Sequence, residues 1–521
     1  MKTRISILFF LILFSYLVHA QEIIPFPNHY EQKEGKLNVP KIVTISTYGE
    51  FSSLIPEFVK TAKRFSIQAK EKVGKGFIQL VWNAAIYNPE EYRLNITSKA
   101  ITIEAGCANG CFYGLQSALQ LISNAGVGGS IPCASIQDRP RYEWRGLMLD
   151  ESRHFMGMKE VKSLLDFMAL HKLNKFHWHL TDSQGWRIEI KQYPLLTSIG
   201  AIGNLTDPNA PAKYYTQAEI AEIVEYAKQR FIEIIPEIDM PGHASSAAKS
   251  YPEFSGGGSE RLPDFTFNPG KDGTYTFLTN ILREVTTLFP SKYIHIGGDE
   301  VHYGNDKWNS LPDIQQLMKT HELKNLVEVE HYFHNRMSDS IKSMGKIFIG
   351  WDEVVQANLP ISNTMVMWWR QERPELLKES IDKGYQVILC PRLPLYFDFI
   401  QNASHKYGRK WSDGKFAPIE SVYNFPGTEY TSGVSISTPL VKGIEACIWT
   451  ERIHTPERLQ FMTYPRLSAL SEAAWTEDRV KNFDNFNARM NGMMKIYKKI
   501  GITFFDYKNP NSSPEVEGAY L

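Results

Sequence analysis

Two patterns of hydrophobic and polar residues divide the chain near residue 140. Before that point, short apolar stretches alternate with polar turns, as at 42–45, 77–81 and 92–96. An amphipathic helix is predicted over 113–123. Residues 21–140 are therefore predicted to form a small α/β domain, and the turn Asp138-Arg139-Pro140-Arg141 marks its end.

From Trp144 onward, apolar strands alternate with amphipathic helices. The predicted strands are 145–149, 175–180, 232–238, 293–296, 347–350, 365–369, 386–389 and 444–449. The clearest helices between them are 161–171, 217–229, 276–289, 327–342 and 374–383. Eight strands joined by helical crossovers predict an α/β fold with a (β/α)8 TIM barrel over 141–480.

The remaining segments of the second half have weaker patterns. Residues 391–439 have few helical cues and are predicted to be a long, loop-rich insertion, and helices are predicted over 458–475 and 486–500. Residues 481–521 are therefore predicted to be a C-terminal helix and tail that pack on the barrel.

The first 20 residues have the pattern of a signal peptide. Lys2 and Arg4 precede an apolar run over 5–18, and Val18-His19-Ala20 offers a small-residue cleavage site. The run is short for a membrane span, and no second one follows it. We expect an exported protein, in the periplasm, outside the cell or in a lumen, without a membrane span after cleavage.

The composition argues against nucleic acid or an anionic membrane as a partner, and against a disulfide framework. The chain has 521 residues, and Lys+Arg and Asp+Glu both number 57, so no basic excess points to nucleic acid or an anionic membrane. The five cysteines do not form a disulfide framework in a chain of this size. Cys107 and Cys111 could pair, but isolated buried thiols are the default interpretation. A homodimer is left open.

Polar and aromatic residues gather where the predicted strands end. In a (β/α)8 barrel, strand ends and the loops that follow them form the active site. A barrel that served as scaffold alone would have little reason to carry such groups at every strand end, so a functional site is predicted there. The residues are Asp150, Arg153, His154, Asp182, Trp186, Glu237, Asp239, His243, Asp299, Glu300, Trp351, Asp352, Glu353, Trp368, Trp369, Arg370, Tyr396, Asp398, Trp449, Thr450 and Glu451.

The most informative of these segments is 295–300, His-Ile-Gly-Gly-Asp-Glu. Asp299 and Glu300 would face opposite sides of a regular strand, so they can serve one pocket only where the strand ends. Gly297 and Gly298 let a ligand or the backbone approach closely. Carboxylates, Arg and Trp without a basic cluster suit a neutral, polyhydroxylated ligand. Glycoside hydrolysis needs a proton donor, and Glu300 is the natural one in a Trp-lined pocket.

Six segments, taken together and in order, make the interpretation specific. They are 145–154, 172–182, 236–243, 295–300, 350–353 and 445–451. In these segments the chain resembles the β-N-acetylhexosaminidases of glycoside hydrolase family 20. The part before residue 140 is similar to the small α/β domain that often precedes that family's barrel.

The resemblance implies exo-acting hydrolysis of terminal, non-reducing β-linked N-acetylhexosamine, GlcNAc or GalNAc, from a glycan or glycoconjugate. It implies a retaining, substrate-assisted mechanism without a cofactor, in which the 2-acetamido oxygen attacks the anomeric carbon and forms an oxazolinium-type intermediate. Glu300 would then be the general acid and base. Asp299 would accept the acetamido N–H.

The resemblance also implies the residues that bind the sugar. Arg153 and Glu451 would hold the C3 and C4 hydroxyls, and Asp398 another hydroxyl, while Tyr396 would contact the acetamido oxygen. Asp182 and His243 would support the catalytic pair. The walls around the acetamido methyl group would be Trp351, Trp369 and Trp449. Trp369 is preferred to Trp368 because it precedes Arg370, and Ser183 stands where many members carry a second aspartate.

Two other function classes were weighed against this one. His177 and His179 share a strand face, as in metal-dependent barrel amidohydrolases, but strands five and six end in Trp, so hydrogen-bonded core histidines and no metal are predicted. A catalytically silent sugar-binding barrel is disfavoured because Asp299 and Glu300 are both present. A lacto-N-biosidase would need a deeper pocket, whereas Arg153 and Glu451 favour removal of a single sugar.

Overall fold

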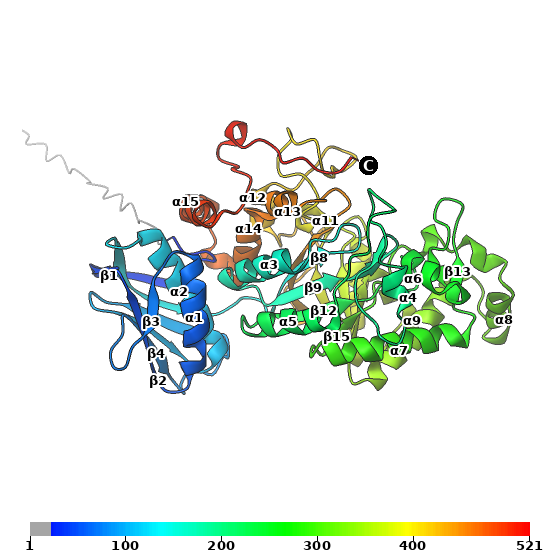
Figure 1. The fold of residues 1–521 in the computed structure, drawn as a ribbon, viewed down its shortest axis with the longest axis horizontal. Helices are drawn as coiled ribbons and strands as arrows, with labels where there is room; N and C mark the ends of the chain where they lie inside the picture. The colour runs from blue at the N-terminus through cyan, green and yellow to red at the C-terminus, as the bar shows by residue number, and fades with distance from the viewer. Residues whose placement is uncertain (1–21, 521) are drawn as a thin grey trace, which may run out of the picture.

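The computed structural model describes residues 22–520, so the predicted signal peptide at 1–20 lies outside the described residues. A small α/β domain lies at one end of the molecule and a barrel at the other (Figure 1). Helix α15 (Phe483–Ile500) lies near their junction and contacts elements of both parts.

The small domain is one seven-stranded mixed sheet with helices α1 (Leu54–Arg64) and α2 (Ala108–Ala125). The sheet has the order β1-β7-β5-β6-β4-β2-β3. Its strands are β1 (His29–Asn38), β2 (Val43–Tyr48), β3 (Ala69–Glu71), β4 (Ile78–Trp82), β5 (Tyr92–Ile96), β6 (Ile101–Ala105) and β7 (Ser130–Asp138). The edge strand β1 is almost wholly exposed and lacks apolar alternation, which is why the sequence did not predict it.

The barrel prediction is confirmed. Parallel strands follow the order β12-β15-β16-β17-β18-β19-β8-β9, and β9 pairs again with β12 to close the barrel. They are β8 (Trp144–Asp150), β9 (Lys175–His179), β12 (Glu233–Glu237), β15 (Tyr293–His295), β16 (Ile347–Trp351), β17 (Thr364–Trp368), β18 (Gln386–Leu389) and β19 (Val441–Ile448).

Helices cover the barrel as the crossover pattern requires. The longer ones are α3 (Met158–Leu170), α5 (Gln217–Lys228), α7 (Asp272–Leu288), α9 (Leu326–Ser343), α10 (Pro374–Lys383), α13 (Pro456–Thr463) and α14 (Arg466–Trp475). Shorter elements in the loops are β10 (Thr181–Asp182), β11 (Gly185–Trp186), β13 (Ser255–Gly257), β14 (Thr266–Phe267), α4 (Leu195–Ser198), α6 (Ser245–Ser250), α8 (Pro312–Thr320), α11 (Arg392–Leu395) and α12 (Ile419–Asn424). The helical stretch predicted over 458–475 is interrupted at Tyr464-Pro465, because proline cannot continue the hydrogen-bond ladder.

A buried ion pair joins the two domains. Lys172, after α3, lies with its Nζ 3.1 Å from an oxygen of Asp138, at the end of β7, and neither side chain is exposed. The same carboxylate accepts hydrogen bonds from the Tyr92 hydroxyl at 2.7 Å and the Trp475 indole at 2.9 Å. The inter-domain contact is therefore a satisfied polar network, which holds the small domain rigidly against the barrel.

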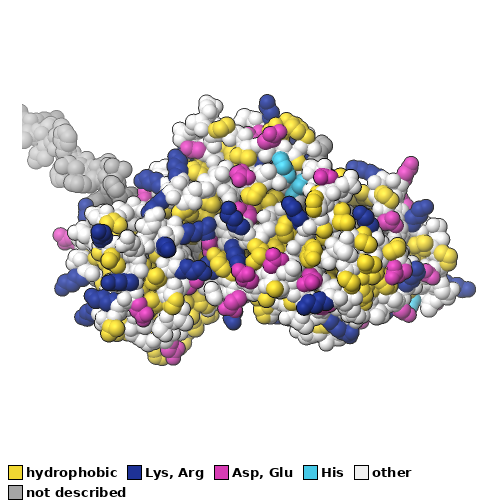
Figure 2. All heavy atoms as spheres, viewed as in Figure 1, with side chains coloured by type: hydrophobic (Ala, Val, Ile, Leu, Met, Phe, Trp, Pro, Cys, Tyr) yellow, Lys and Arg dark blue, Asp and Glu magenta, His cyan; other side chains and the backbone are white. Residues whose placement is uncertain are grey.

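The C-terminal helix contacts both domains. Helix α15 packs against α2 of the small domain and α12 of the barrel, and its Arg489 lies 2.6 Å from Glu472 of α14. Acidic and basic side chains are interspersed over the face shown in Figure 2. Among the described residues, no helix combines the length and apolar character needed to cross a membrane. All five cysteines are free; Cys107 is exposed and the others are buried.

The inter-domain ion pair generates a stability prediction. Lys172→Met should lower the free energy of unfolding by about 3–5 kcal/mol, because it leaves the buried Asp138 without its cation. The matched control is Lys378→Met, which removes a pair whose lysine side chain is 65% exposed and should cost less than about 1 kcal/mol. Denaturant unfolding of both variants measures the difference, and equal losses would contradict the prediction.

Candidate active site

A small cavity of about 90 Å³ opens at the carboxyl ends of the barrel strands. Its lining residues are Arg153, His243, Asp299, Glu300, Trp351, Trp369, Arg392, Tyr396, Arg409, Trp449 and Glu451. Of the residues that the family resemblance assigns to catalysis or sugar binding, all except Asp182 and Asp398 line it, and these two contact lining residues. Arg392 and Arg409 were not predicted.

The loop after β15 brings both adjacent carboxylates to this cavity. Gly297 and Gly298 have φ of 69° and 86°, and a Cβ at Gly297 would lie 1.9 Å from an oxygen of Asp239. Glu300 also adopts the left-handed region, with φ of 54°. The resulting turn directs both carboxylates toward one imidazole nitrogen: His243 Nε2 lies 3.6 Å from Asp299 and 3.7 Å from Glu300.

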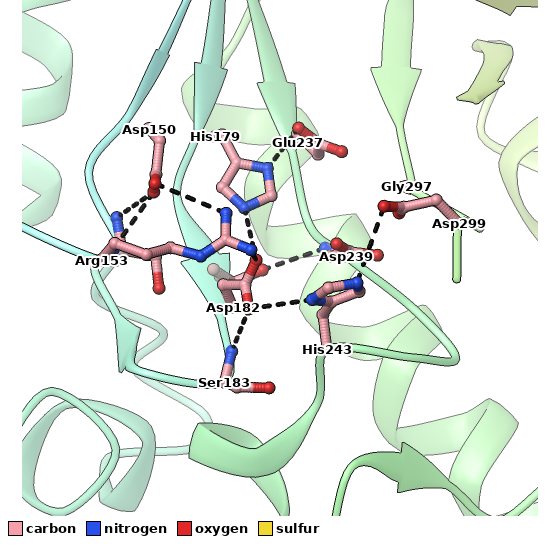
Figure 3. Close-up of polar contacts among 12 residues, drawn as sticks. Asp150, Arg153, His179, Asp182, Ser183, Glu237, Asp239, His243, Gly297 and Asp299 are labelled. Atoms are coloured by element: carbon pink, nitrogen blue, oxygen red, sulfur yellow. Dashed lines mark hydrogen bonds and ion pairs between the residues drawn. The ribbon is translucent and has the colours of Figure 1, made fainter. Parts of the chain in front are cut away.

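Asp182 supports this arrangement through contacts with both His243 and Arg153, as Figure 3 shows. One carboxylate oxygen lies 3.0 Å from His243 Nδ1, and the other lies 2.7 Å from Arg153 Nη2 and 3.1 Å from His179 Nε2. The neighbouring Ser183 donates its backbone N–H to Asp182 at 2.5 Å. A serine at 183 therefore leaves the contacts of Asp182 intact.

The charges of His243 and of the aspartates around it determine which of these side chains are protonated. Burial opposes protonation of His243, but Asp182, Asp299 and Asp239 outweigh that effect and raise its pKa well above 6.5. Burial raises the pKa of Asp299 to about 6, although the His243 imidazolium acts to lower it. Asp239 has a pKa raised well above its usual value, first by burial and then by Asp299. The site therefore holds a cationic His243 beside an Asp299 that ionises near neutral pH.

Deeper in the barrel, the buried carboxylate of Glu237 is shared by three histidines and a tryptophan. Oε2 lies 3.0 Å from His177 and 2.5 Å from His179, and Oε1 lies 3.0 Å from His295. The Trp351 indole donates to Oε1 at 3.1 Å. Glu237 itself is fully buried, and the pKa of its carboxyl is held well below its usual range by these imidazoles, although burial opposes this.

Spacing alone would allow a metal at His177, Glu237 and His295. However, the carboxylates Glu237 and Glu445, against the effect of burial, raise the pKa of His177 to about 9. A doubly protonated imidazole has no lone pair for a metal. The contacts therefore fit the hydrogen-bonded interpretation of His177 better than the metal-ligating one.

Two of the three tryptophans predicted to surround the acetamido methyl group donate hydrogen bonds to carboxylates. Besides the bond from Trp351 to Glu237, the Trp369 indole donates to Glu353 at 3.1 Å, and its backbone N–H donates to Asp352 at 3.1 Å. Trp449 lies 6.0 Å from Trp351 between ring centroids. Trp368 instead packs in the outer layer between strands and helices.

Arg409 is held at the cavity by two carboxylates. Its Nε lies 2.9 Å from Asp398, and its Nη2 lies 2.5 Å from Glu451. Burial raises the pKa of Asp398 to about 7, against the effect of Arg409. Among residues 22–520, six buried atoms of the cavity-lining residues have no hydrogen-bond partner: Arg153 Nε, His243 Nε2, Asp299 Oδ1, Arg392 Nε, Trp449 Nε1 and Glu451 Oε2. These are polar groups that a bound ligand can satisfy.

Sequence reasoning missed Arg392 and Arg409 for different reasons. Arg392 follows β18 by three residues, so its position at a strand end could have identified it. Arg409 lies far into the loop between β18 and β19, and its backbone N–H donates to Asp398 at 3.0 Å. That contact depends on how the loop folds back, and no motif marks it.

Comparison with known families agrees with this geometry. Residues 142–478 match the catalytic domain of glycosyl hydrolase family 20, and residues 20–139 match domain 2 of that family. The chain belongs to glycosyl hydrolase family 20.

Relatives of known structure or description support the assignment. The chain is 33% identical to a β-hexosaminidase of Porphyromonas gingivalis over 90% of its own length, but it spans only 62% of that relative. It is 30% identical to the human β-hexosaminidase subunit beta, covering 78% of this chain and 70% of that one. An exo β-N-acetylglucosaminidase of Vibrio harveyi, solved with N-acetylglucosamine, superposes with a TM-score of 0.85 at 32% identity and covers 93% of this chain and 78% of its own.

Proposed function

We propose that this protein removes terminal β-linked N-acetylhexosamine, GlcNAc or GalNAc, from the non-reducing ends of glycans. One observation carries the proposal: Asp299 and Glu300, adjacent in sequence, both face His243 Nε2 at the same cavity. Two such carboxylates can act on different atoms of one substrate. The names of the Vibrio harveyi and human relatives support the same activity.

In the proposed reaction, the carbonyl oxygen of the substrate's 2-acetamido group attacks the anomeric carbon. Glu300, whose side chain is 33% exposed, protonates the departing glycosidic oxygen, and the bond between that oxygen and the anomeric carbon breaks. Asp299 accepts the acetamido N–H and stabilises the positive charge of the oxazolinium-type intermediate. Glu300 then deprotonates the water that opens this intermediate, so the anomeric configuration is retained.

The remaining side chains hold one sugar. Arg153 and Glu451 would bind the C3 and C4 hydroxyls, since each presents a buried polar atom that lacks a partner in the described part of the chain. Asp398, next to Arg409, would bind a further hydroxyl. Tyr396 would contact the acetamido oxygen.

The acetamido methyl group would contact Trp351, Trp369 and Trp449, whose indoles line one side of the cavity. Asp182 and His243 would orient the catalytic pair. The small volume of the cavity supports removal of a single sugar rather than a disaccharide. We also propose that residues 1–20 direct export of the protein.

The first experiment compares hydrolysis of a chromogenic β-N-acetylglucosaminide with that of the matching β-glucoside, each with and without EDTA. We expect cleavage of the acetamido substrate alone, unchanged by the chelator. Equal cleavage of both substrates would remove the acetamido group from the chemistry. Loss of activity with EDTA would favour a metal-dependent hydrolase, and no cleavage of either would favour a silent sugar-binding barrel.

Glu300→Gln tests the general acid. Because a good leaving group needs little protonation, we expect a loss of about 10²–10⁴-fold in kcat/KM on a disaccharide and a much smaller loss on an activated aryl glycoside. Steady-state kinetics on both substrates measures the contrast. Equal losses would contradict the acid role.

The pH profile tests Asp299. Only the carboxylate form accepts the acetamido N–H, and the pKa of Asp299 is about 6, so kcat/KM should fall as the pH drops through about 6. His243→Asn removes the cation that lowers this pKa, so the acidic limb should move upward by on the order of one pH unit. In the control Ser245→Ala, which removes a neutral hydroxyl near Ser183, the limb should stay in place. A His243→Asn limb that stays or moves downward would contradict the prediction.

A further inference from the structure

Arg392 is held at the mouth of the active-site cavity between two indole rings. Its guanidinium carbon lies 4.7 Å from the ring centroid of Trp369 and 4.8 Å from that of Trp411. Such cation–π contacts favour a fixed position over the ring faces. The charged group is therefore presented in one orientation beside Glu300, which lines the same cavity.

A second, larger cavity of about 490 Å³ lies next to Arg392, which contacts two of the residues that line it. It is lined by Trp411, which stacks on Arg392, and by Glu372, which forms an ion pair with Arg392. Apolar groups such as Leu393 and Phe416 make up much of the remaining lining. Arg392 therefore connects the two cavities: it lines the inner one together with Glu300, and it contacts two residues that line the outer one.

The charge of Arg392 is available to a ligand, whereas that of Arg409 is not. The acidic partner of Arg392 is Glu372, whose side chain is 38% exposed, and such a surface pair is weak and easily exchanged. The buried Nε of Arg392 has no hydrogen-bond partner within residues 22–520. Arg409 instead forms ion pairs with two carboxylates, Asp398 and Glu451, whose side chains are only 1% and 16% exposed, so its charge is already compensated.

We propose that the outer cavity binds the group to which the terminal hexosamine is linked, and that Arg392 selects a leaving sugar that carries a carboxylate, that is, a uronic acid. The planar guanidinium matches a carboxylate through paired N–H···O bonds. The apolar lining covers the less polar face of the ring. This inference rests on the proposed function, since it assigns Glu300 to the leaving side of the bond.

The test compares two disaccharides of the same linkage, N-acetylglucosamine β-linked to glucuronic acid and to glucose. The wild-type protein should hydrolyse the acidic disaccharide with a kcat/KM roughly tenfold or more above that of the neutral one. The preference should weaken at high salt. Arg392→Gln should bring the ratio close to one.

Two controls separate this role from other effects. Lys415→Gln removes a cation from the rim of the outer cavity whose side chain is 72% exposed, and it should keep the wild-type ratio. Arg392→Lys keeps the positive charge but removes the planar guanidinium, and it should give a ratio of acidic to neutral kcat/KM between those of the wild-type protein and Arg392→Gln. The wild-type ratio by itself can overturn the inference, even if an Arg392 variant fails to fold.

A wild-type ratio near one would overturn the inference while the proposed function stands. A ratio that Arg392→Gln leaves unchanged, or that Lys415→Gln lowers equally, would likewise overturn the assignment to Arg392. If the protein cleaves neither disaccharide nor an aryl β-N-acetylglucosaminide, the proposed function fails, and this inference fails with it.

Discussion

The carboxylate of Glu237 lies inside the barrel and connects the carboxyl ends of β9, β12, β15 and β16. It contacts His177 and His179 from one neighbouring strand, His295 from the other, and Trp351 from the strand beyond. A buried charge of this kind is tolerated only when all of its partners are in place. The strand ends are therefore held in one relative position, and the cavity above them is preorganised.

Two short chains of contacts connect the Glu237 carboxylate to side chains of the cavity and hold them in position. His179 connects Glu237 to Asp182, which in turn orients Arg153 and His243. Trp351 connects the same carboxylate directly to the cavity wall. Functional side chains that are held by fixed partners lose little freedom when a ligand binds, so more of the binding interaction is left for the reaction.

The backbone is strained at the residues closest to the proposed chemistry. His243 and Glu300 both have φ of 54°, a region that costs a residue with a Cβ roughly 1–2 kcal/mol. Gly297 avoids a collision with Asp239 that any other residue would meet. Packing of the surrounding barrel holds this conformation, which brings two consecutive carboxylates to one imidazole nitrogen.

The sequence by itself determined the barrel and most of the candidate site. Alternation of apolar strands with amphipathic helices specifies a parallel barrel, and the strand-end rule then places residues such as Asp299, Trp351 and Glu451 at one opening. Only the tertiary structure decided which groups behind and around them matter. The sequence marked Glu237 only as one of many polar groups at strand ends, whereas in the structure it connects four strands. Arg409 meets the site only because a long loop folds back on itself, and such a contact leaves no local pattern of hydrophobic and polar residues from which it could be predicted.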